Sequence, residues 1–169
     1  DPNGINLGYK RITISTAGIV KRIEQFSKER QKFKLAISLN GTTNAQRLSI
    51  MPVTKNNPLE NLLNVSDNYT SSSNTWITFE YVLIKDCNDD LSDADRLITI
   101  LSGINKCKLN VIPYNMTDGI FQRPDEQQIK LFMKKLNNAP FPVTIRWSKG
   151  TDIDAGCGQL VISDNLMST

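Results

Sequence analysis

The sequence of 169 residues contains no histidine, only three cysteines and no long apolar run. Without histidine, the chain itself can form neither a Ser-His-Asp or Cys-His catalytic site nor a His-ligated zinc, iron or copper centre. No stretch approaches the roughly 18 consecutive apolar residues that a membrane-spanning helix needs. The net charge of +3 does not by itself indicate a nucleic-acid partner. A general base in this chain would have to be a carboxylate, Lys, Tyr or Cys.

The cysteines are too few and too widely spaced for a disulfide framework or a self-contained metal site. They are Cys87, Cys107 and Cys157, and the sequence contains neither a Cys-x-x-Cys nor a Cys-x-x-x-Cys pair. An odd number of unpaired cysteines is typical of a reducing compartment, so we expect a cytoplasmic protein.

Short β-branched runs alternate along the chain with amphipathic helical patterns. We expect strands at residues 11–15, 34–39, 77–84, 107–114 and 142–147. Helices are expected at residues 19–26, 58–64, 92–101 and 124–136, with Ser92 capping the third, and loops at residues 40–44 and 67–75. This alternation predicts one α/β region with a parallel sheet. No glycine-rich loop follows the first strand, which excludes a dinucleotide-binding fingerprint.

Polar residues follow the carboxyl ends of the predicted strands. In parallel α/β folds, ligands bind at this edge of the sheet. Hydroxyl and amide groups there suit a ribose, an amino-acid backbone or a base edge, although each group is equally able to cap the next helix or turn. The residues concerned are Ser15, Ser38, Asn40, Lys85, Asp86, Asn115, Ser148 and Lys149.

Cys157 lies between two glycines in an irregular segment near the end of the sequence. Small neighbours leave room around its sulfur for a bulky ligand or a base. Cys107, by contrast, begins an apolar strand-like run, which is typical of a buried structural thiol. Cys157 is therefore the candidate for a reactive cysteine, a role that also depends on its exposure and its pKa.

Eight segments of the sequence resemble, in order, the motifs of one enzyme family. The segments are RITISTAGIV, LAISLN, IMPVTK, PLENLL, ITFEYVLIK, CKLNVIPYN, RPDE and DIDAGCGQL. They resemble the radical S-adenosylmethionine (SAM) methyltransferases that methylate adenine C2 in 23S ribosomal RNA. This is the RlmN family, to which Cfr, acting at adenine C8, is related. The resemblance extends from the start of the sequence to Leu160.

The resemblance implies a fold and a division of the protein. The chain would be the C-terminal portion of a partial (β/α)6 TIM-like barrel with mostly parallel strands, starting just before the fourth strand. Residues 1–169 would form a single region of that barrel. The half that binds a [4Fe–4S] cluster would lie upstream, since the family's Cys-x-x-x-Cys-x-x-Cys motif does not occur in this sequence.

The resemblance also implies roles for individual residues. Cys157 would be the catalytic residue that becomes S-methylcysteine as an intermediate. Lys149 stands where the family usually has arginine, and it keeps the charge but loses the bidentate geometry. SAM would be bound by five residues, of which Asn40 replaces the usual histidine: Ser15, Ser38, Leu39, Asn40 and Asn115.

For the whole protein, the resemblance implies a radical mechanism and a set of partners. One SAM would methylate Cys157, and a second, cleaved at the cluster, would generate the radical that activates this methyl group. The substrate would be rRNA, with tRNA as a second candidate, and the target base would have to leave its stack. An electron donor such as flavodoxin, a monomeric state and no membrane association are further implied.

Two other interpretations are open from the sequence. The chain could be a non-catalytic SAM- or RNA-binding module that lacks the cluster half, or a small Cys-dependent transferase complete in 169 residues. The second is weaker, because no base or metal ligand accompanies Cys157. As a member of an enzyme family without its cluster cysteines, the chain alone is expected to be inactive.

Overall fold

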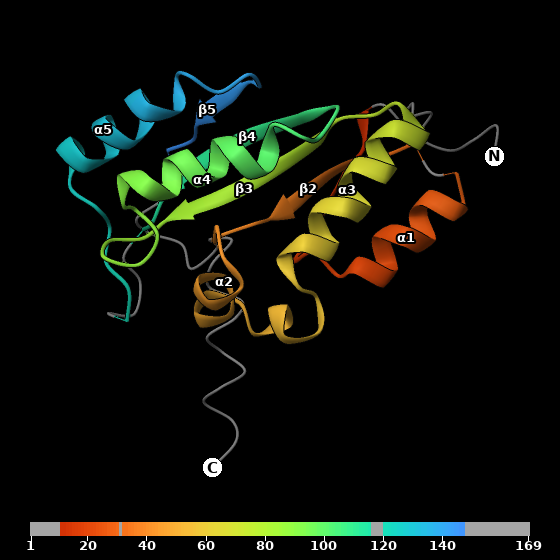
Figure 1. Ribbon diagram of the computed structural model, residues 1–169, viewed down its shortest axis with the longest axis horizontal. Coiled ribbons are helices and arrows are strands. Elements are labelled where there is room, and N and C mark those ends of the chain that lie inside the picture. Colours follow the sequence, from red (N-terminus) through yellow and green to blue (C-terminus); the bar gives the residue numbers. More distant parts are fainter. Residues whose placement is uncertain (1–10, 31, 116–119, 148–169) are drawn as a thin grey trace, which may run out of the picture.

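The computed structural model describes residues 11–30, 32–115 and 120–147. Five parallel strands form one sheet in the sequential order β1-β2-β3-β4-β5 (Figure 1). The strands are β1 (Thr13–Thr16), β2 (Lys34–Ser38), β3 (Ile77–Leu83), β4 (Cys107–Pro113) and β5 (Val143–Ile145). The helices are α1 (Val20–Lys28), α2 (Asn44–Ile50), α3 (Leu59–Ser73), α4 (Leu91–Leu101) and α5 (Glu126–Leu136), with the 3-10 helix η2 (Pro52–Asn56) between α2 and α3.

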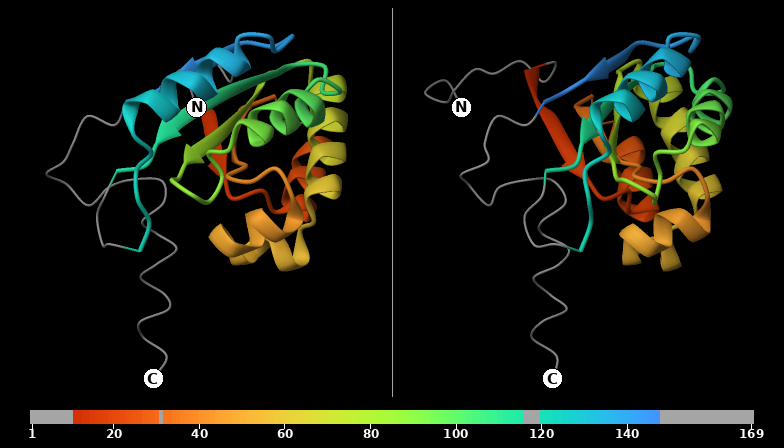
Figure 2. Two further views of the ribbon diagram at one scale, coloured as in Figure 1. Left: turned by 60° about the vertical axis from the view of Figure 1, so that its left-hand side comes forward. Right: turned by 90° about the vertical axis from the view of Figure 1, so that its left-hand side faces the viewer.

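Helices α1, α3, α4 and α5 lie on the same side of the sheet (Figure 2). Connections between parallel strands are right-handed, so a strand order that never reverses places every connecting helix on one face. A doubly wound sheet reverses its order and is covered by helices on both faces. One-sided coverage is instead the geometry of a segment of a (β/α) barrel, whose uncovered face is the inside. The predicted α/β class is therefore confirmed.

The main core fills the space between the sheet and these helices. Alternate strand residues such as Ile37, Phe79 and Leu109 point toward the helices and are fully buried. Tyr81 and Phe132 stack across the interface between β3 and α5, with 6.0 Å between their ring centroids. This core orients the strands and leaves their other side chains on the helix-free face.

The expectation of a polar loop at residues 67–75 is wrong, because α3 continues through most of them. Tyr69 is fully buried, and its hydroxyl donates a 2.7 Å hydrogen bond to the carbonyl of Phe33. The Thr70 hydroxyl bonds to the Asp67 carbonyl of the same helix at 2.9 Å. Asn74 ends the helix in the left-handed conformation, with φ of 58°. This segment is polar in composition, yet it is helical, because hydroxyl groups such as that of Thr70 form hydrogen bonds within the helix.

Three further expectations need correction. Asp90 rather than Ser92 caps α4, and its carboxylate accepts a 2.8 Å hydrogen bond from the Ser92 amide. Helices α2 and η2 occupy a segment for which no element was expected. A start just before the fourth of six strands would leave three strands, whereas the described residues already contain five. Among the described residues, no helix is long and apolar enough to cross a membrane.

Candidate functional site

A row of polar side chains crosses the helix-free face of the sheet. Ser38, Glu80, Asn110 and Thr144 are register partners on the four adjacent strands β2 to β5. Neighbouring strands are about 4.8 Å apart, so the row spans roughly 14 Å. The Thr144 hydroxyl donates to the Asn110 side-chain oxygen at 3.2 Å, which leaves the Asn110 amide nitrogen as a donor. We call these four residues the polar row.

An apolar cluster borders the polar row toward the carboxyl ends of the strands. Val82 and Ile112 are register partners two residues beyond Glu80 and Asn110, so they lie on the same face. Tyr114 packs edge to face against Phe121, with ring centroids 5.9 Å apart. The helix-free face thus changes from polar to apolar within two residues along β3 and β4. The apolar cluster consists of Val82, Ile84, Ile112 and Tyr114.

Arg47 of α2 joins the carboxyl ends of β1 and β2. Its fully buried guanidinium donates to the carbonyl of Ala17 at 2.7 Å and to that of Leu39 at 3.1 Å. It also donates to the Thr54 hydroxyl at 2.8 Å. No carboxylate among the described residues pairs with it, and burial lowers its pKa to about 10. The charge is balanced by carbonyl dipoles at the edge of the sheet where ligands bind.

Two glycines make room for Arg47. A Cβ atom on Gly18, whose φ is +87°, would lie 2.9 Å from the guanidinium nitrogen Nη2. A Cβ on Gly41 would lie 2.7 Å from the backbone nitrogen of Arg47. The loops after β1 and β2 therefore depend on residues without side chains at these two positions.

Asn88 joins β2 to β3 in a similar way. Its side-chain nitrogen donates to the carbonyls of Asn40 at 3.0 Å and Val82 at 2.8 Å, and its side-chain oxygen accepts from the Ile84 amide at 2.7 Å. Asn88 is fully buried, and its own carbonyl accepts a 2.7 Å hydrogen bond from the Tyr81 hydroxyl. Buried, fully satisfied networks of this kind fix local geometry.

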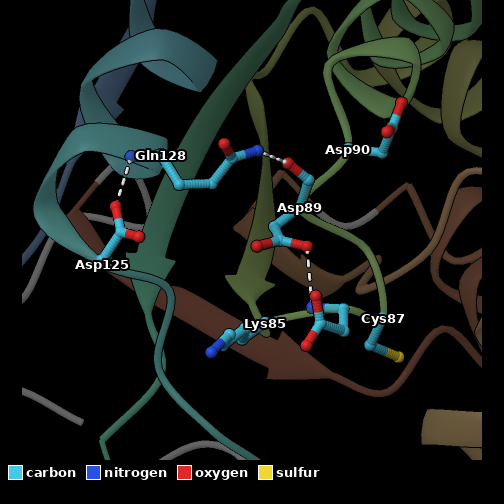
Figure 3. Close-up of a pocket in the computed structure, with 7 residues that line it drawn as sticks. Lys85, Cys87, Asp89, Asp90, Asp125 and Gln128 are labelled. Atoms are coloured by element: carbon cyan, nitrogen blue, oxygen red, sulfur yellow. Dashed lines mark hydrogen bonds between the residues drawn. The ribbon is translucent and has the colours of Figure 1, made fainter.

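An open pocket of about 430 Å³ lies between the loop after β3 and the start of α5 (Figure 3). Gln128 donates through its side chain to the Asp89 carbonyl at 2.5 Å, and the Asp89 carboxylate accepts from the Asp86 amide at 2.9 Å. Burial raises the pKa of Asp89 above its usual value. The described residues contain no group of three His, Cys, Asp or Glu side chains placed to hold a metal ion. The lining residues are Lys85, Asp86, Cys87, Asp89, Asp90, Asp125 and Gln128.

No family model matches the sequence, but its curated relatives include proteins named RlmN. The chain is 40% identical over 163 residues to the probable dual-specificity RNA methyltransferase RlmN of Pseudothermotoga lettingae, a match covering 96% of this chain and 47% of the relative. It is 39% identical over 162 residues to the dual-specificity RNA methyltransferase RlmN of Syntrophobacter fumaroxidans, covering 95% and 47%. Over almost its whole length, this chain is a homologue of the RlmN proteins. It spans about half the length of the curated RlmN proteins it matches.

Solved structures agree with this similarity. A crystal structure of a radical SAM methyltransferase from Sphaerobacter thermophilus superposes with a TM-score of 0.87 at 37% identity, covering 94% of this chain and 47% of that one. A domain of pyruvate-formate lyase-activating enzyme from Bacteroides vulgatus superposes with a TM-score of 0.64 at 16% identity, covering 79% and 80%. The second match extends the similarity of fold alone beyond the RlmN family.

The five residues expected to bind SAM from the resemblance to RlmN lie in different surroundings. Ser15 and Ser38 lie on the helix-free face, and Asn115 lies half-buried after β4. The Leu39 side chain is fully buried in the main core, so only its backbone borders the strand ends. Asn40 is buried, and its side-chain oxygen accepts a 2.9 Å hydrogen bond from the Val82 amide.

Cys157 and Lys149 lie outside the residues that the structure describes, as does Ser148. The other two cysteines have environments unsuited to nucleophilic chemistry. Cys107 is buried, its sulfur lies 3.5 Å from the Leu101 carbonyl, and burial raises its pKa to about 11. Burial also raises the pKa of the half-buried Cys87 thiol. The expectation that Cys107 is a buried structural thiol is confirmed.

Glu80, Asn110 and Arg47 were not anticipated from the sequence. The site residues expected from the sequence lie at or just after the strand ends, whereas Glu80 and Asn110 lie within strands. The sequence does distinguish Glu80 and Asn110, because each is a polar residue between two apolar ones in an otherwise apolar run. Arg47 gave no such signal, since a charged residue in an unassigned segment is normally exposed.

Proposed function

We propose that this chain is the C-terminal half of an RlmN-type methyltransferase that methylates adenine C2 in 23S rRNA, with tRNA as a second substrate. The observation that carries the proposal is the helix-free face, where a polar row across β2 to β5 meets an apolar cluster toward the carboxyl ends of β3 and β4. Ligands of barrel folds bind at these ends, and the relatives named RlmN are RNA methyltransferases.

The chain's own residues do not fit a [4Fe–4S] cluster. Three cysteine thiolates at Cys-x-x-x-Cys-x-x-Cys spacing are absent from the whole sequence, and the described residues offer no alternative set of ligands. We therefore assign cluster binding, and the electron donor it would need, to the remainder of the full-length protein.

The helix-free face does fit SAM. Ser15 and Ser38 offer hydroxyl groups, and Asn110 offers a free amide donor, which match the hydroxyl, amino and carboxylate groups of that molecule. The neighbouring apolar cluster is buried, with each member at most 8% exposed, so an adenine ring would pack at its border with the polar row. When bound, SAM supplies the methyl group that is transferred. Residues of this face would orient SAM, and Arg47 and Asn88 hold the neighbouring strand ends in place.

Cys157 is the residue that we assign to carrying the methyl group. A nucleophilic cysteine reacts as its thiolate, so a raised pKa and burial oppose the role. Both conditions apply to Cys107, and the pKa of Cys87 is also raised. Cys157 is the only remaining cysteine, and its neighbours Gly156 and Gly158 leave space for a base that has left its stack.

The test uses the full-length protein with its cluster reconstituted. Transfer of the labelled methyl group from SAM to an rRNA fragment is measured for the wild type, Cys157→Ala and the matched control Cys87→Ala. We expect no transfer with Cys157→Ala and near wild-type transfer with the control. Transfer by Cys157→Ala would refute the assigned role, and no transfer by a correctly loaded wild type would refute the proposed function.

The lack of cluster ligands also favours a second candidate, a SAM- or RNA-binding module without catalytic activity. The two candidates differ in what the gene encodes upstream of Asp1. A Cys-x-x-x-Cys-x-x-Cys motif in the same reading frame supports the enzyme. A start codon at that point, combined with SAM binding but no methyl transfer, supports the module.

A further inference from the structure

Glu80 is a half-buried carboxylate at the centre of the polar row. Within the part of the chain that the structure describes, its side chain has neither a hydrogen-bond partner nor an ion-pair partner. Its backbone is fixed, because the Glu80 carbonyl accepts a 2.8 Å hydrogen bond from the Leu39 amide. The sheet thus fixes the backbone of Glu80, and no counter-ion among the described residues holds its carboxylate.

The register partners of Glu80, which are Ser38 and Asn110, are neutral. Lys108 lies on the same face, two residues before Asn110. The Lys108 ammonium lies 5.1 Å from the centroid of the Trp76 ring, and no ion pair joins it to Glu80. Partial burial without compensation is costly for a carboxylate, which accepts hydrogen bonds and offers none.

The position of Glu80 relative to the apolar cluster indicates which ligand group it would bind. Val82 follows Glu80 by two residues on the same face, about 7 Å further along the strand. An acceptor next to an apolar surface matches a nucleoside, in which a ribose with two adjacent hydroxyl donors is joined directly to a flat base. Carboxylates bind ribose hydroxyls in the same manner in dinucleotide-binding folds.

We propose that Glu80 binds the ribose hydroxyls of SAM and so positions the adenosine along β3, an inference that rests on the proposed function. The base would then lie at the border between the polar row and the buried apolar cluster. Ser38 and the Asn110 amide would flank the ribose on either side. Glu80 is a specificity-determining residue for the nucleoside, distinct from Cys157.

The test compares three forms of the full-length protein: wild type, Glu80→Gln and Glu24→Gln. Glu24 is an exposed carboxylate of α1, on the helix-covered side of the sheet, and serves as the matched control. Dissociation constants are measured for SAM and for S-adenosylhomocysteine lacking both ribose hydroxyls. Because hydrogen bonds to charged groups contribute about 1.5–3 kcal/mol, we expect Glu80→Gln to weaken SAM binding about 10- to 100-fold. The control should not change it.

The deoxygenated analogue decides whether the ribose is involved. It should bind wild type and Glu80→Gln equally, because the hydroxyls that Glu80 would accept from are missing. An equal loss for both ligands would refute the ribose assignment, as would unchanged SAM binding with a lowered melting temperature. If Glu80→Gln does not fold, Glu80→Asp keeps the charge, and unweakened SAM binding by that shorter side chain would equally refute it. Failure of the wild type to bind SAM would refute the proposed function itself.

Discussion

Replacing Arg47 with methionine tests how the candidate site is held together. Methionine keeps much of the side-chain volume but removes every donor. The carbonyls of Ala17 and Leu39 and the Thr54 hydroxyl then lose bonds of 2.7, 3.1 and 2.8 Å inside the protein. These bonds tie together the carboxyl ends of β1 and β2, so the substitution affects stability and site geometry together.

Two opposing contributions set the magnitude. Hydrogen bonds to charged groups contribute about 1.5–3 kcal/mol each, so three short ones amount to roughly 5–9 kcal/mol. Burial of the guanidinium opposes this, since lowering the pKa of Arg47 to about 10 corresponds to about 3 kcal/mol of lost solvation. We expect Arg47→Met to lower the free energy of unfolding by about 3 kcal/mol, within a range of roughly 2–6 kcal/mol.

Urea denaturation followed by circular dichroism measures this change. A loss of about 3 kcal/mol corresponds to a fall in melting temperature of roughly 6–12 °C for a chain of this size. Arg22→Met is the control, because Arg22 lies exposed on α1 and makes one side-chain bond, to Gln25 at 3.2 Å. It should change stability by less than about 0.5 kcal/mol. If Arg47→Met were as stable as this control, burial of the charge would offset all of its hydrogen bonds, and Arg47 would not secure the strand ends.

Two further predictions concern buried polar groups. Asn88→Asp replaces the donor to the Asn40 and Val82 carbonyls with a carboxylate that repels both, and should lower the free energy of unfolding by about 2–4 kcal/mol in urea denaturation. A smaller loss at pH 4 than at pH 7, measured relative to wild type, would follow from protonation, and an equal loss would contradict the mechanism. For Cys107, burial raises the pKa to about 11, so the thiol stays protonated in the folded state while the unfolded chain loses its proton from about pH 9. The contribution of this thiol to the free energy of unfolding is fully present below about pH 9. It is lost as the pH rises through about 11, and the loss reaches roughly 3 kcal/mol. Cys107→Ala should therefore show a shallower alkaline decline in stability, and an identical decline would exclude the thiol as its cause.

The strands could be predicted from sequence because their apolar runs are long and rich in β-branched residues. The run at residues 77–84 coincides with β3 (Ile77–Leu83), and the run at residues 107–114 coincides with β4 (Cys107–Pro113). Both central strands are paired on each side, so burial and propensity favour the same conformation. The edge strand β5 (Val143–Ile145) is shorter than residues 142–147, since pairing on one side supports fewer residues.

The helical segments were harder to predict where polar residues are buried. The second half of α3 has the composition of a loop, yet Ser66 donates to the Leu62 carbonyl at 2.7 Å and the buried Tyr69 reaches Phe33. Such partners lie one helical turn away or in a distant loop. Propensity assigned residue by residue cannot anticipate them, because tertiary contacts decide whether the hydroxyls compete with the helix or are satisfied by it.

The candidate site could be predicted only in outline, and Asn40 shows why. The strand-end rule correctly located Ser38 at the edge of the sheet but gave Asn40 equal weight, and the resemblance to RlmN added Leu39 to the two. Leu39 points into the main core, and Asn40 adopts the left-handed conformation with φ of 52°, which asparagine tolerates better than most residues. The Asn40 side-chain oxygen takes the place of a backbone acceptor for the Val82 amide. The backbone and the side chain of Asn40 therefore both help to hold the end of β2 against β3. In this chain the asparagine side chain therefore has a role in the sheet itself, which accounts for asparagine at this position without any demand from the ligand.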